Sequence, residues 1–273
     1  MATTQLPVFQ TVFDTYGMLA KNWVKGITVL IGPIVLLIAI AILGFLMVGA
    51  TMMSATSTDI TAAASGGHIL SMLIFLVLLL FPYTMIYVGL FRLGINGDTS
   101  GSGFLGVTWG KRETRVLLRS ILLGIILIVL AIPVMIVVSL IVGGIFIGIG
   151  TGQAPSVFSI LISGVLMFIL GWVPLAFVGM RLSLYPASPA VDEDISLGGS
   201  WSQTSGNGLR LVAISILVAL PIYVINLAIG LILGSGLIAS ILSLVLMIVS
   251  IMLTPFLMSI IYKALANRAA AAA

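Results

Sequence analysis

Six stretches of this chain are almost continuously apolar, and each is longer than about 18 residues. A helix of that length crosses a hydrocarbon layer about 30 Å thick, because each residue adds about 1.5 Å along the helix axis. A spanning β-barrel would instead need shorter segments in which apolar and polar residues alternate. The pattern therefore predicts an all-α integral membrane protein with six transmembrane helices, at residues 26–50, 68–91, 116–141, 157–180, 211–233 and 237–262.

An amphipathic pattern precedes the first crossing, at residues 7–24. Apolar side chains recur there at steps of three and four, as on one face of a helix, at Phe9, Val12, Phe13, Tyr16, Ala20 and Trp23. Such a helix either lies in the cytoplasmic membrane interface or packs beneath the bundle. Periodicity does not distinguish the two, because it does not reveal what covers the apolar face.

Each predicted crossing contains one proline, and the flanking residues recur in the same order. The odd crossings follow a Trp and a basic residue, whereas the even crossings have a proline about two turns before a basic residue. Because proline removes a backbone hydrogen bond and kinks a helix, its repeated placement indicates repeated geometry. We therefore expect three parallel helical-hairpin repeats with cytoplasmic interfacial helices, containing Pro33, Pro82, Pro133, Pro174, Pro221 and Pro255.

Charged residues are rare and lie on one side of the predicted crossings. The chain is 61% hydrophobic and 7% charged, whereas a soluble domain is about 25% charged. Loops kept in the cytoplasm carry excess Lys and Arg. With the N-terminus inside, all the basic residues fall on that side: Lys21, Lys25, Arg92, Lys111, Arg112, Arg115, Arg119, Arg181, Arg210, Lys263 and Arg268. Both termini are therefore expected in the cytoplasm, and the net charge of +4 does not indicate nucleic acid.

The polar interval after the fourth crossing, with the start of the fifth, reads RLSLYPASPAVDEDISLGGSWSQTSGNGLRLVAISIL. It resembles the signature of the membrane domain of bacterial glycerophosphoryl diester phosphodiesterases and its stand-alone relatives of unknown function. The matching positions are Arg181, Pro186, the acidic residues 192–194, Ser200, Trp201, Thr204, Gly206 and Arg210. The resemblance implies a multi-pass protein of the bacterial cytoplasmic (inner) membrane.

Catalysis is not carried over from this family. Its Ser-Trp segment usually has more basic residues than SQTSGNG, and no phosphodiesterase domain follows the last helix. That activity needs carboxylates and histidines around a divalent metal, whereas this chain has seven acidic residues, one His and no Cys. We expect no enzymatic activity and no catalytic, cofactor or metal site.

The centres of the predicted crossings hold no Asp, Glu, Lys, Arg or His, which ion-coupled transporters usually place there. The most polar central side chains follow two of the prolines, at Tyr83, Thr84, Tyr87, Tyr223 and Asn226. They either line a small polar pathway or hydrogen-bond between helices, and we favour hydrogen bonding because proline frees backbone groups. The expected anchors at the membrane surface are Trp23, Trp109, Trp201, Arg181 and Arg210.

Three further features have modest structural interpretations. His68 has too few potential ligands nearby for a metal site, which favours an ordinary interfacial histidine. The acidic residues 192–194 are expected to cap the positive end of a following helix or to be solvated. Two Gly-x-x-x-Gly pairs, Gly144 with Gly148 and Gly230 with Gly234, favour close helix contacts, more within the protein than with another subunit.

These features predict a non-catalytic membrane protein, a scaffold or accessory subunit of a membrane complex. Its expected partners are membrane lipids and other membrane subunits. The alternative is a permease or lipid-translocating protein, which six kinked helices around a common axis would allow. A water-accessible cavity that reaches Tyr223 or Asn226 from either side would favour the permease, and a closed bundle with one large flat apolar face would favour the subunit.

Overall fold

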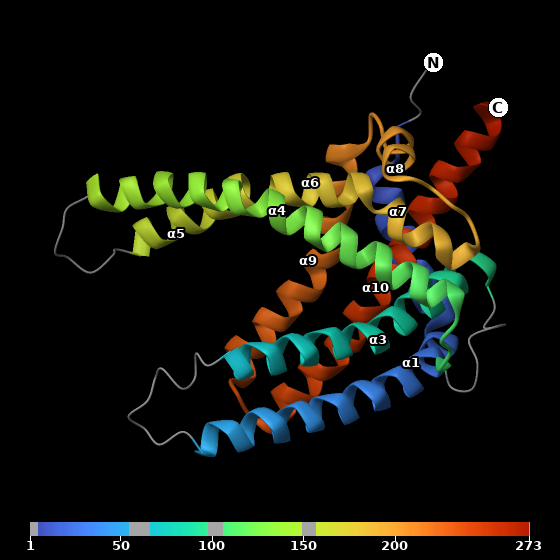
Figure 1. The fold of residues 1–273 in the computed structure, drawn as a ribbon. Helices are drawn as coiled ribbons and strands as arrows, with labels where there is room; N and C mark the ends of the chain where they lie inside the picture. Colours follow the sequence, from blue (N-terminus) through green and yellow to red (C-terminus); the bar gives the residue numbers. More distant parts are fainter. Residues whose placement is uncertain (1–4, 55–65, 98–105, 149–156, 273) are drawn as a thin grey trace.

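The computed structural model describes residues 5–54, 66–97, 106–148 and 157–272, with side chains over 5–46, 70–97, 106–144 and 160–265. Every regular element in these ranges is helical (Figure 1). Five long helices are α1 (Val8–Ser54), α3 (Gly66–Asn96), α4 (Lys111–Gly148), α9 (Gly208–Leu233) and α10 (Leu237–Ala272). A sixth combines α5 (Val157–Leu166), the π-helical turn η2 (Met167–Trp172) and α6 (Val173–Leu182). Between α6 and α9 lie α7 (Leu184–Ala187), the 3-10 helix η3 (Ser188–Val191) and α8 (Leu197–Gln203).

Within the described ranges, six helices are long and apolar enough to cross a membrane, which confirms the prediction of an all-helical, multi-pass protein. Each contains one predicted crossing, and most extend beyond it. The longest, α1, has 47 residues, about 70 Å at 1.5 Å per residue, or more than twice the thickness of the hydrocarbon layer. The segment 7–24, expected as a separate helix, leads into α1 without a break, and its position in the membrane interface stays a prediction.

All six prolines of the predicted crossings lie within these helices. Pro174 differs from the others because it directly follows the π-helical turn η2, near the start of α6. A proline at this position cannot donate to the carbonyl of Leu170, which lies inside η2, and its ring crowds that carbonyl. The wider π-helical turn gives the ring room, so the sixth helix continues past Pro174.

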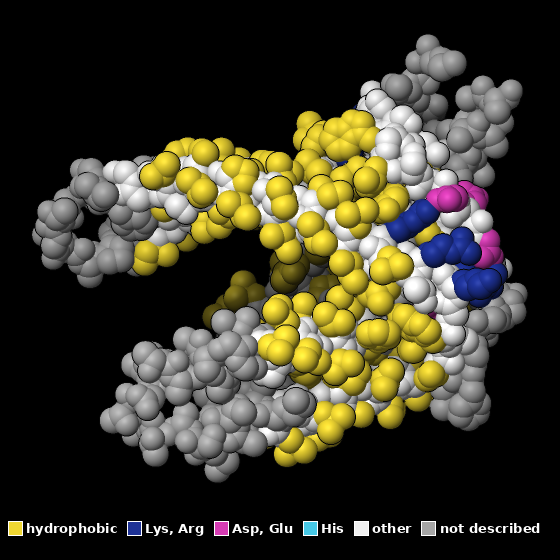
Figure 2. All heavy atoms as spheres, in the orientation of Figure 1, with side chains coloured by type: hydrophobic (Ala, Val, Ile, Leu, Met, Phe, Trp, Pro, Cys, Tyr) yellow, Lys and Arg dark blue, Asp and Glu magenta, His cyan; other side chains and the backbone are white. Residues whose placement is uncertain are grey.

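The helices converge at one end of the molecule and separate toward the other (Figure 1). At the converging end, Lys25 and Lys263 bond the last turn of α3, and Arg112 and Arg119 bond the segment 188–195. We call this the basic end, and Figure 2 shows Lys and Arg side chains gathered there. Consecutive long helices are paired, α1 with α3, α4 with α5 to α6, and α9 with α10. Three hairpins require this pairing, whereas their origin as repeats stays a prediction.

The molecule divides into two arms. One contains α4 with α5, η2 and α6, the other contains α1, α3 and α10, and α9 contacts both. Figure 2 shows a wedge-shaped opening between the arms, with hydrophobic side chains along its inner walls. Only 6% of the most apolar 18-residue window of α4 is buried within the chain, against 33% for α3. The arm formed by α4 to α6 therefore has apolar faces that the described chain does not cover.

The tightest packing occurs among α1, α3 and α10. Two clusters of buried apolar side chains lie there and at the junction with α9. Glycines bring these helices close together: a Cβ at Gly26 would lie 2.0 Å from Met252 Cε, and one at Gly89 would lie 2.5 Å from Val29 Cγ1. Close contact of this kind is what small residues permit between membrane helices.

The Gly-x-x-x-Gly pairs do not make such contacts. Among the described residues, no atom outside their immediate surroundings lies within 4 Å of a Cβ built on Gly144, Gly230 or Gly234. Within the part of the chain that the structure describes, these three glycines therefore do not mediate the close packing expected of them. Gly234 instead follows the last residue of α9, with a φ of 62°. Gly148 lies outside the residues whose side chains the structure describes.

Candidate functional site

A cavity of about 370 Å³ lies between α6, α9 and α10. It is lined by side chains of α9 from Ser215 to Asn226 and of α10 from Met247 to Met258, at helical spacing, and by Met180 of α6. Most of the lining is apolar, and its polar members are Ser215, Tyr223, Asn226, Ser250 and Thr254. Tyr223 is 72% exposed, and Asn226 and Thr254 are exposed as well, so the cavity is open to the surface at these residues. Apolar walls with a few polar groups suit an amphipathic molecule.

The cavity brings together two of the five residues considered for a polar pathway, Tyr223 and Asn226. The other three, Tyr83, Thr84 and Tyr87, lie on α3 and do not line it. The Tyr87 ring instead stacks on Phe91, with centroids 5.9 Å apart. Asn226 Oδ1 also accepts a hydrogen bond of 3.1 Å from Ser243 Oγ of α10. Asn226 therefore bonds between helices, as favoured from the sequence, and borders the cavity as well.

Three of the polar lining residues, Ser215, Ser250 and Thr254, were not singled out from the sequence. The available signal is their spacing. Ser215, Tyr223 and Asn226 recur along one face of α9, while Ser250 and Thr254 are one turn apart on α10. Two polar faces on consecutive helices of one hairpin favour a shared polar lining, although the same pattern also suits interhelical hydrogen bonds.

Arg181 organises the polar segment between α6 and α9. Its guanidinium carbon lies 4.2 Å from the centroid of the Trp201 ring and 5.9 Å from that of Phe177, and the two rings meet edge to face. A cation over an aromatic face is attracted by the ring quadrupole. The backbone oxygen of Arg181 accepts hydrogen bonds from Ser200 Oγ at 2.9 Å and Thr204 Oγ1 at 3.1 Å. These positions of the signature therefore hold α8 against α6.

The acidic residues Asp192, Glu193 and Asp194 bind three different side chains. Asp192 forms a two-point pair with a guanidinium, with Nε to Oδ1 at 2.6 Å. Glu193 accepts a hydrogen bond from a tyrosine hydroxyl, and Asp194 forms an ion pair. Their partners, in order, are Arg112 of α4, Tyr262 of α10 and Arg119 of α4. We call these three contacts the acidic ties, because they join one short segment to both arms.

Of the two expectations for these acidic residues, helix capping is therefore wrong, whereas solvation holds for the side chains of Asp192 and Asp194, which are 56% and 80% exposed. The helix that follows, α8, is capped by Ser196, whose Oγ accepts a hydrogen bond of 3.0 Å from the backbone N–H of Gly199. A Ser at this position supplies the acceptor that the first turn needs, so no carboxylate is required. The acidic side chains remain free to reach α4 and α10.

Arg119 is the most extensively bonded of the basic residues. Beyond Asp194, its Nη1 donates to Ser188 Oγ at 2.9 Å and to the backbone oxygens of Tyr185 and Ile195. The guanidinium also lies over the Tyr185 ring, 4.8 Å from its centroid. Because its hydrogen bonds go to this chain, Arg119 acts as a structural tie between α4 and the segment after α6.

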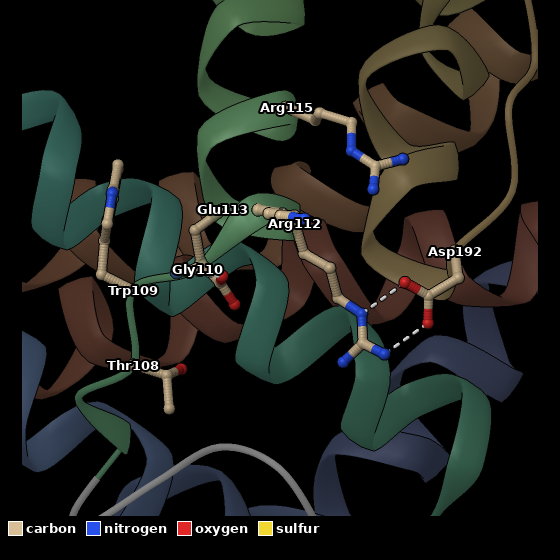
Figure 3. A pocket seen from close by; sticks show the side chains of 8 residues that line it. Thr108, Trp109, Gly110, Arg112, Glu113, Arg115 and Asp192 are labelled. Atoms are coloured by element: carbon tan, nitrogen blue, oxygen red, sulfur yellow. Dashed lines mark hydrogen bonds and ion pairs between the residues drawn. The ribbon is translucent and has the colours of Figure 1, made fainter.

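A shallow pocket of about 480 Å³ lies beside the Arg112–Asp192 pair, at the start of α4 (Figure 3). Glu113 Oε2 accepts a hydrogen bond of 2.8 Å from the Gly110 N–H and so caps the helix. Arg115 extends on the same side of α4 as Arg112 (Figure 3). The hydrogen bond from Arg112 holds the pKa of Asp192 below its usual range. The carboxylates thus offset much of the positive charge around this pocket.

The remaining predicted anchors are spread along the molecule. Trp23 on α1 is 57% exposed, and Trp109 packs against Phe81 with ring centroids 4.6 Å apart. Arg210 of α9 donates to the backbone oxygen of Leu6 at 3.0 Å, while Asn207 Oδ1 accepts from the Leu6 N–H at 2.9 Å. Arg210 therefore ties the segment before α1 to α9. Their role as membrane anchors stays a prediction.

These observations define the class of protein: an all-helical, multi-pass membrane protein with a surface-open cavity between α6, α9 and α10. Comparisons with protein-family models, with curated proteins and with solved structures found no match. The resemblance to the phosphodiesterase membrane domain therefore stays a prediction. In the part of the chain that the structure describes, no three His, Asp or Glu side chains gather as a metal site would require. His68 lies in α3, outside the described side chains.

Proposed function

We propose that this protein is a permease or lipid-translocating protein that holds an amphipathic molecule between α6, α9 and α10. The observation that carries the proposal is the cavity of about 370 Å³, whose polar lining reaches Tyr223 and Asn226 inside a helical hairpin. The lining contains hydroxyl and amide groups and no ionisable acid or base apart from the tyrosine. Such groups orient a polar head by hydrogen bonds, while the apolar walls accommodate a hydrocarbon part.

The wedge between the arms supports access from the lipid. Its walls are hydrophobic (Figure 2), so an acyl chain can enter from the side without leaving an apolar environment. The acidic ties lie at the basic end, where they hold the arms together. In this proposal the basic end faces the cytoplasm of a bacterial cell, as the distribution of Lys and Arg predicts.

The test is transport by the purified protein in vesicles. Fluorescent phospholipid is included in both leaflets, and its movement is followed as the loss of protection from an impermeant reductant. We expect faster loss than in protein-free vesicles. Ser250→Leu, which fills the cavity, should slow the movement severalfold, whereas Ser240→Leu adds the same bulk on the same helix at an exposed position outside the cavity and should leave it unchanged. Equal rates with and without protein would rule out lipid translocation.

A second candidate, an accessory subunit of a membrane complex, is favoured by the uncovered apolar faces of α4 to α6. The most apolar window of each of these two spans is only 6% buried within the chain. Extensive apolar contact area of this kind suits either lipid or another membrane protein. Copurification from native membranes in a mild detergent distinguishes the candidates. A stoichiometric partner, together with no transport by the isolated protein, would favour the subunit.

A further inference from the structure

A larger pocket, of about 840 Å³, lies at the basic end between α1, the last turn of α3 and α10. It is distinct from the cavity between α6, α9 and α10, because none of its lining residues is shared. Three lysines border it, Lys21 and Lys25 of α1 and Lys263 of α10. We call this the lysine pocket.

Two of the lysines are held in place by the end of α3. Lys25 Nζ donates to the backbone oxygen of Gly97 at 2.8 Å, and Lys263 Nζ donates to that of Gly94 at 2.9 Å. Cations near the C-terminus of a helix stabilise it, so these bonds have a structural role. However, each ammonium carries three N–H donors, and one carbonyl uses only one of them. The remaining donors are positioned for another acceptor.

The third lysine, Lys21, does not bond the end of α3, which Lys25 and Lys263 already stabilise. Lys21 lines the same pocket and is exposed, and no hydrogen bond from its Nζ occurs within the described residues. The opposing negative charges are Asp14 and the C-terminal end of α3, which is equivalent to about half an elementary charge. Three positive charges against these leave roughly +1.5 in the pocket, so it attracts an anion.

Apolar side chains share the lining with two amides, Asn22 and Asn96, which distinguishes the lysine pocket from a purely ionic surface. Phe13, Met18, Ile260 and Ala264 contribute to it, and Phe13 is 73% exposed. An inorganic anion would leave these side chains in contact with water. An anionic phospholipid would place its phosphate against the lysines and the start of its acyl chains against the apolar side chains.

We propose that the lysine pocket binds the phosphate headgroup of an anionic phospholipid from the leaflet at the basic end. Basic pockets between membrane helices recognise anionic lipid headgroups through this combination of charge and apolar surface. The proposal does not depend on the transport function, since the lysine pocket lies among α1, α3 and α10 and the cavity does not.

The test is a lipid titration of the full-length protein in a neutral detergent, read as the thermal unfolding midpoint. Short-chain phosphatidylglycerol should raise the midpoint, and phosphatidylcholine with the same chains should raise it less. Lys21→Gln removes a charge without removing a described hydrogen bond. It should raise the phosphatidylglycerol concentration for half-maximal effect about fivefold, as expected for one lysine near an anionic surface. Asp14→Asn should lower that concentration.

The matched control is Lys111→Gln, which removes a basic charge from the start of α4, outside the lysine pocket. It should leave the titration unchanged. Equal effects of Lys21→Gln and Lys111→Gln would indicate general charge attraction and overturn the site. Equal shifts with phosphatidylcholine would overturn recognition of the anion. A shift with inorganic phosphate at the same concentration would assign the pocket to a soluble phosphate compound and overturn the lipid.

Discussion

Gly106 occupies one of the most restrictive positions in the molecule. Its φ is +80°, in the left-handed region, and a Cβ there would lie 2.0 Å from the backbone oxygen of Val29 in α1. Gly97, at the end of α3, has a similar φ of +76°, but among the described residues nothing lies within 4 Å of its Cβ position. The first glycine therefore serves both the turn and the close approach to α1, whereas the second serves only the turn.

We predict that Gly106→Ala destabilises the protein more than Gly97→Ala does. Both variants pay about 1 to 2 kcal/mol for the left-handed backbone, and only Gly106→Ala must also displace the backbone of α1. Thermal unfolding of the two variants in the same detergent measures the difference. Similar midpoints for both would mean that the segment before α4 does not rest on Val29 as described.

The segment between α6 and α8 shows how a short element can organise long ones. Its three consecutive acidic residues reach two arms because Asp192 turns the chain with a φ of 62°. Asp adopts this left-handed conformation more readily than most residues do. The acidic ties therefore depend on backbone shape as much as on charge.

We predict that this segment weakens in acid. Since Arg112 lowers the pKa of Asp192 in the folded protein, the pair stabilises fully above the unfolded pKa of about 3.9 and loses that contribution as pH falls through the folded pKa. Asp192→Asn keeps the left-handed turn without the charge. The difference in unfolding midpoint between the wild type and this variant should shrink below about pH 4. The effect is small, because the Asp192 side chain is 56% exposed.

The outcome that would contradict this prediction is a difference in midpoint that stays constant through acid. That result would mean that the difference between the two proteins does not arise from the charge of Asp192. The ion pair is also accessible to salt, so the same difference should fall when the ionic strength is raised at neutral pH.

At the scale of the whole molecule, the direction of the helices determines how deep each residue lies in the bilayer. Trp172 precedes Arg181 by nine residues in the η2–α6 helix, which places it about 14 Å further from the basic end. Trp201 contacts Arg181 and therefore lies near the level of that guanidinium. The two tryptophans should consequently lie at different depths if the chain spans the membrane as its helices indicate.

Single-tryptophan variants, with the other three replaced by Phe, test this arrangement. We expect Trp172 to be quenched most by lipids brominated deep in the acyl chain, and Trp201 most by lipids brominated near the headgroup. The measurement is tryptophan fluorescence in reconstituted vesicles. Equal depths for Trp172 and Trp201 would contradict the inferred orientation of this arm.

The six helices could be predicted from the sequence, because length and composition alone decide whether a segment can span a membrane. The way the helices pack could not. A helix such as α9 is apolar on nearly all sides, so no stripe indicates which face meets a neighbour. For the same reason Gly26 and Gly89, which do pack closely, were not distinguished from Gly144 and Gly230, which do not.

The candidate site was predicted only in part. Tyr223 and Asn226 stood out because polar residues are rare inside apolar helices. The cavity that they border depends on the angle between α6 and the last hairpin, which no local pattern encodes. Likewise the sequence shows that residues 192–194 are negatively charged but does not show which side chains they bind. Their partners Arg112 and Tyr262 lie far along the chain from them.

The contacts between α1 and α9 impose an order on the synthesis of the protein. Leu6 bonds Asn207 and Arg210, and the Tyr16 hydroxyl donates to the Val218 oxygen, across separations of 201 to 204 residues. A ribosome adding about 5 to 20 residues per second needs roughly 10 to 40 seconds to make the intervening chain. The N-terminal segment and α1 are therefore made long before these partners at residues 207–218 exist. A nascent chain that stops before α9 leaves the N-terminal segment without these contacts, open to chaperones and proteases until the last hairpin arrives.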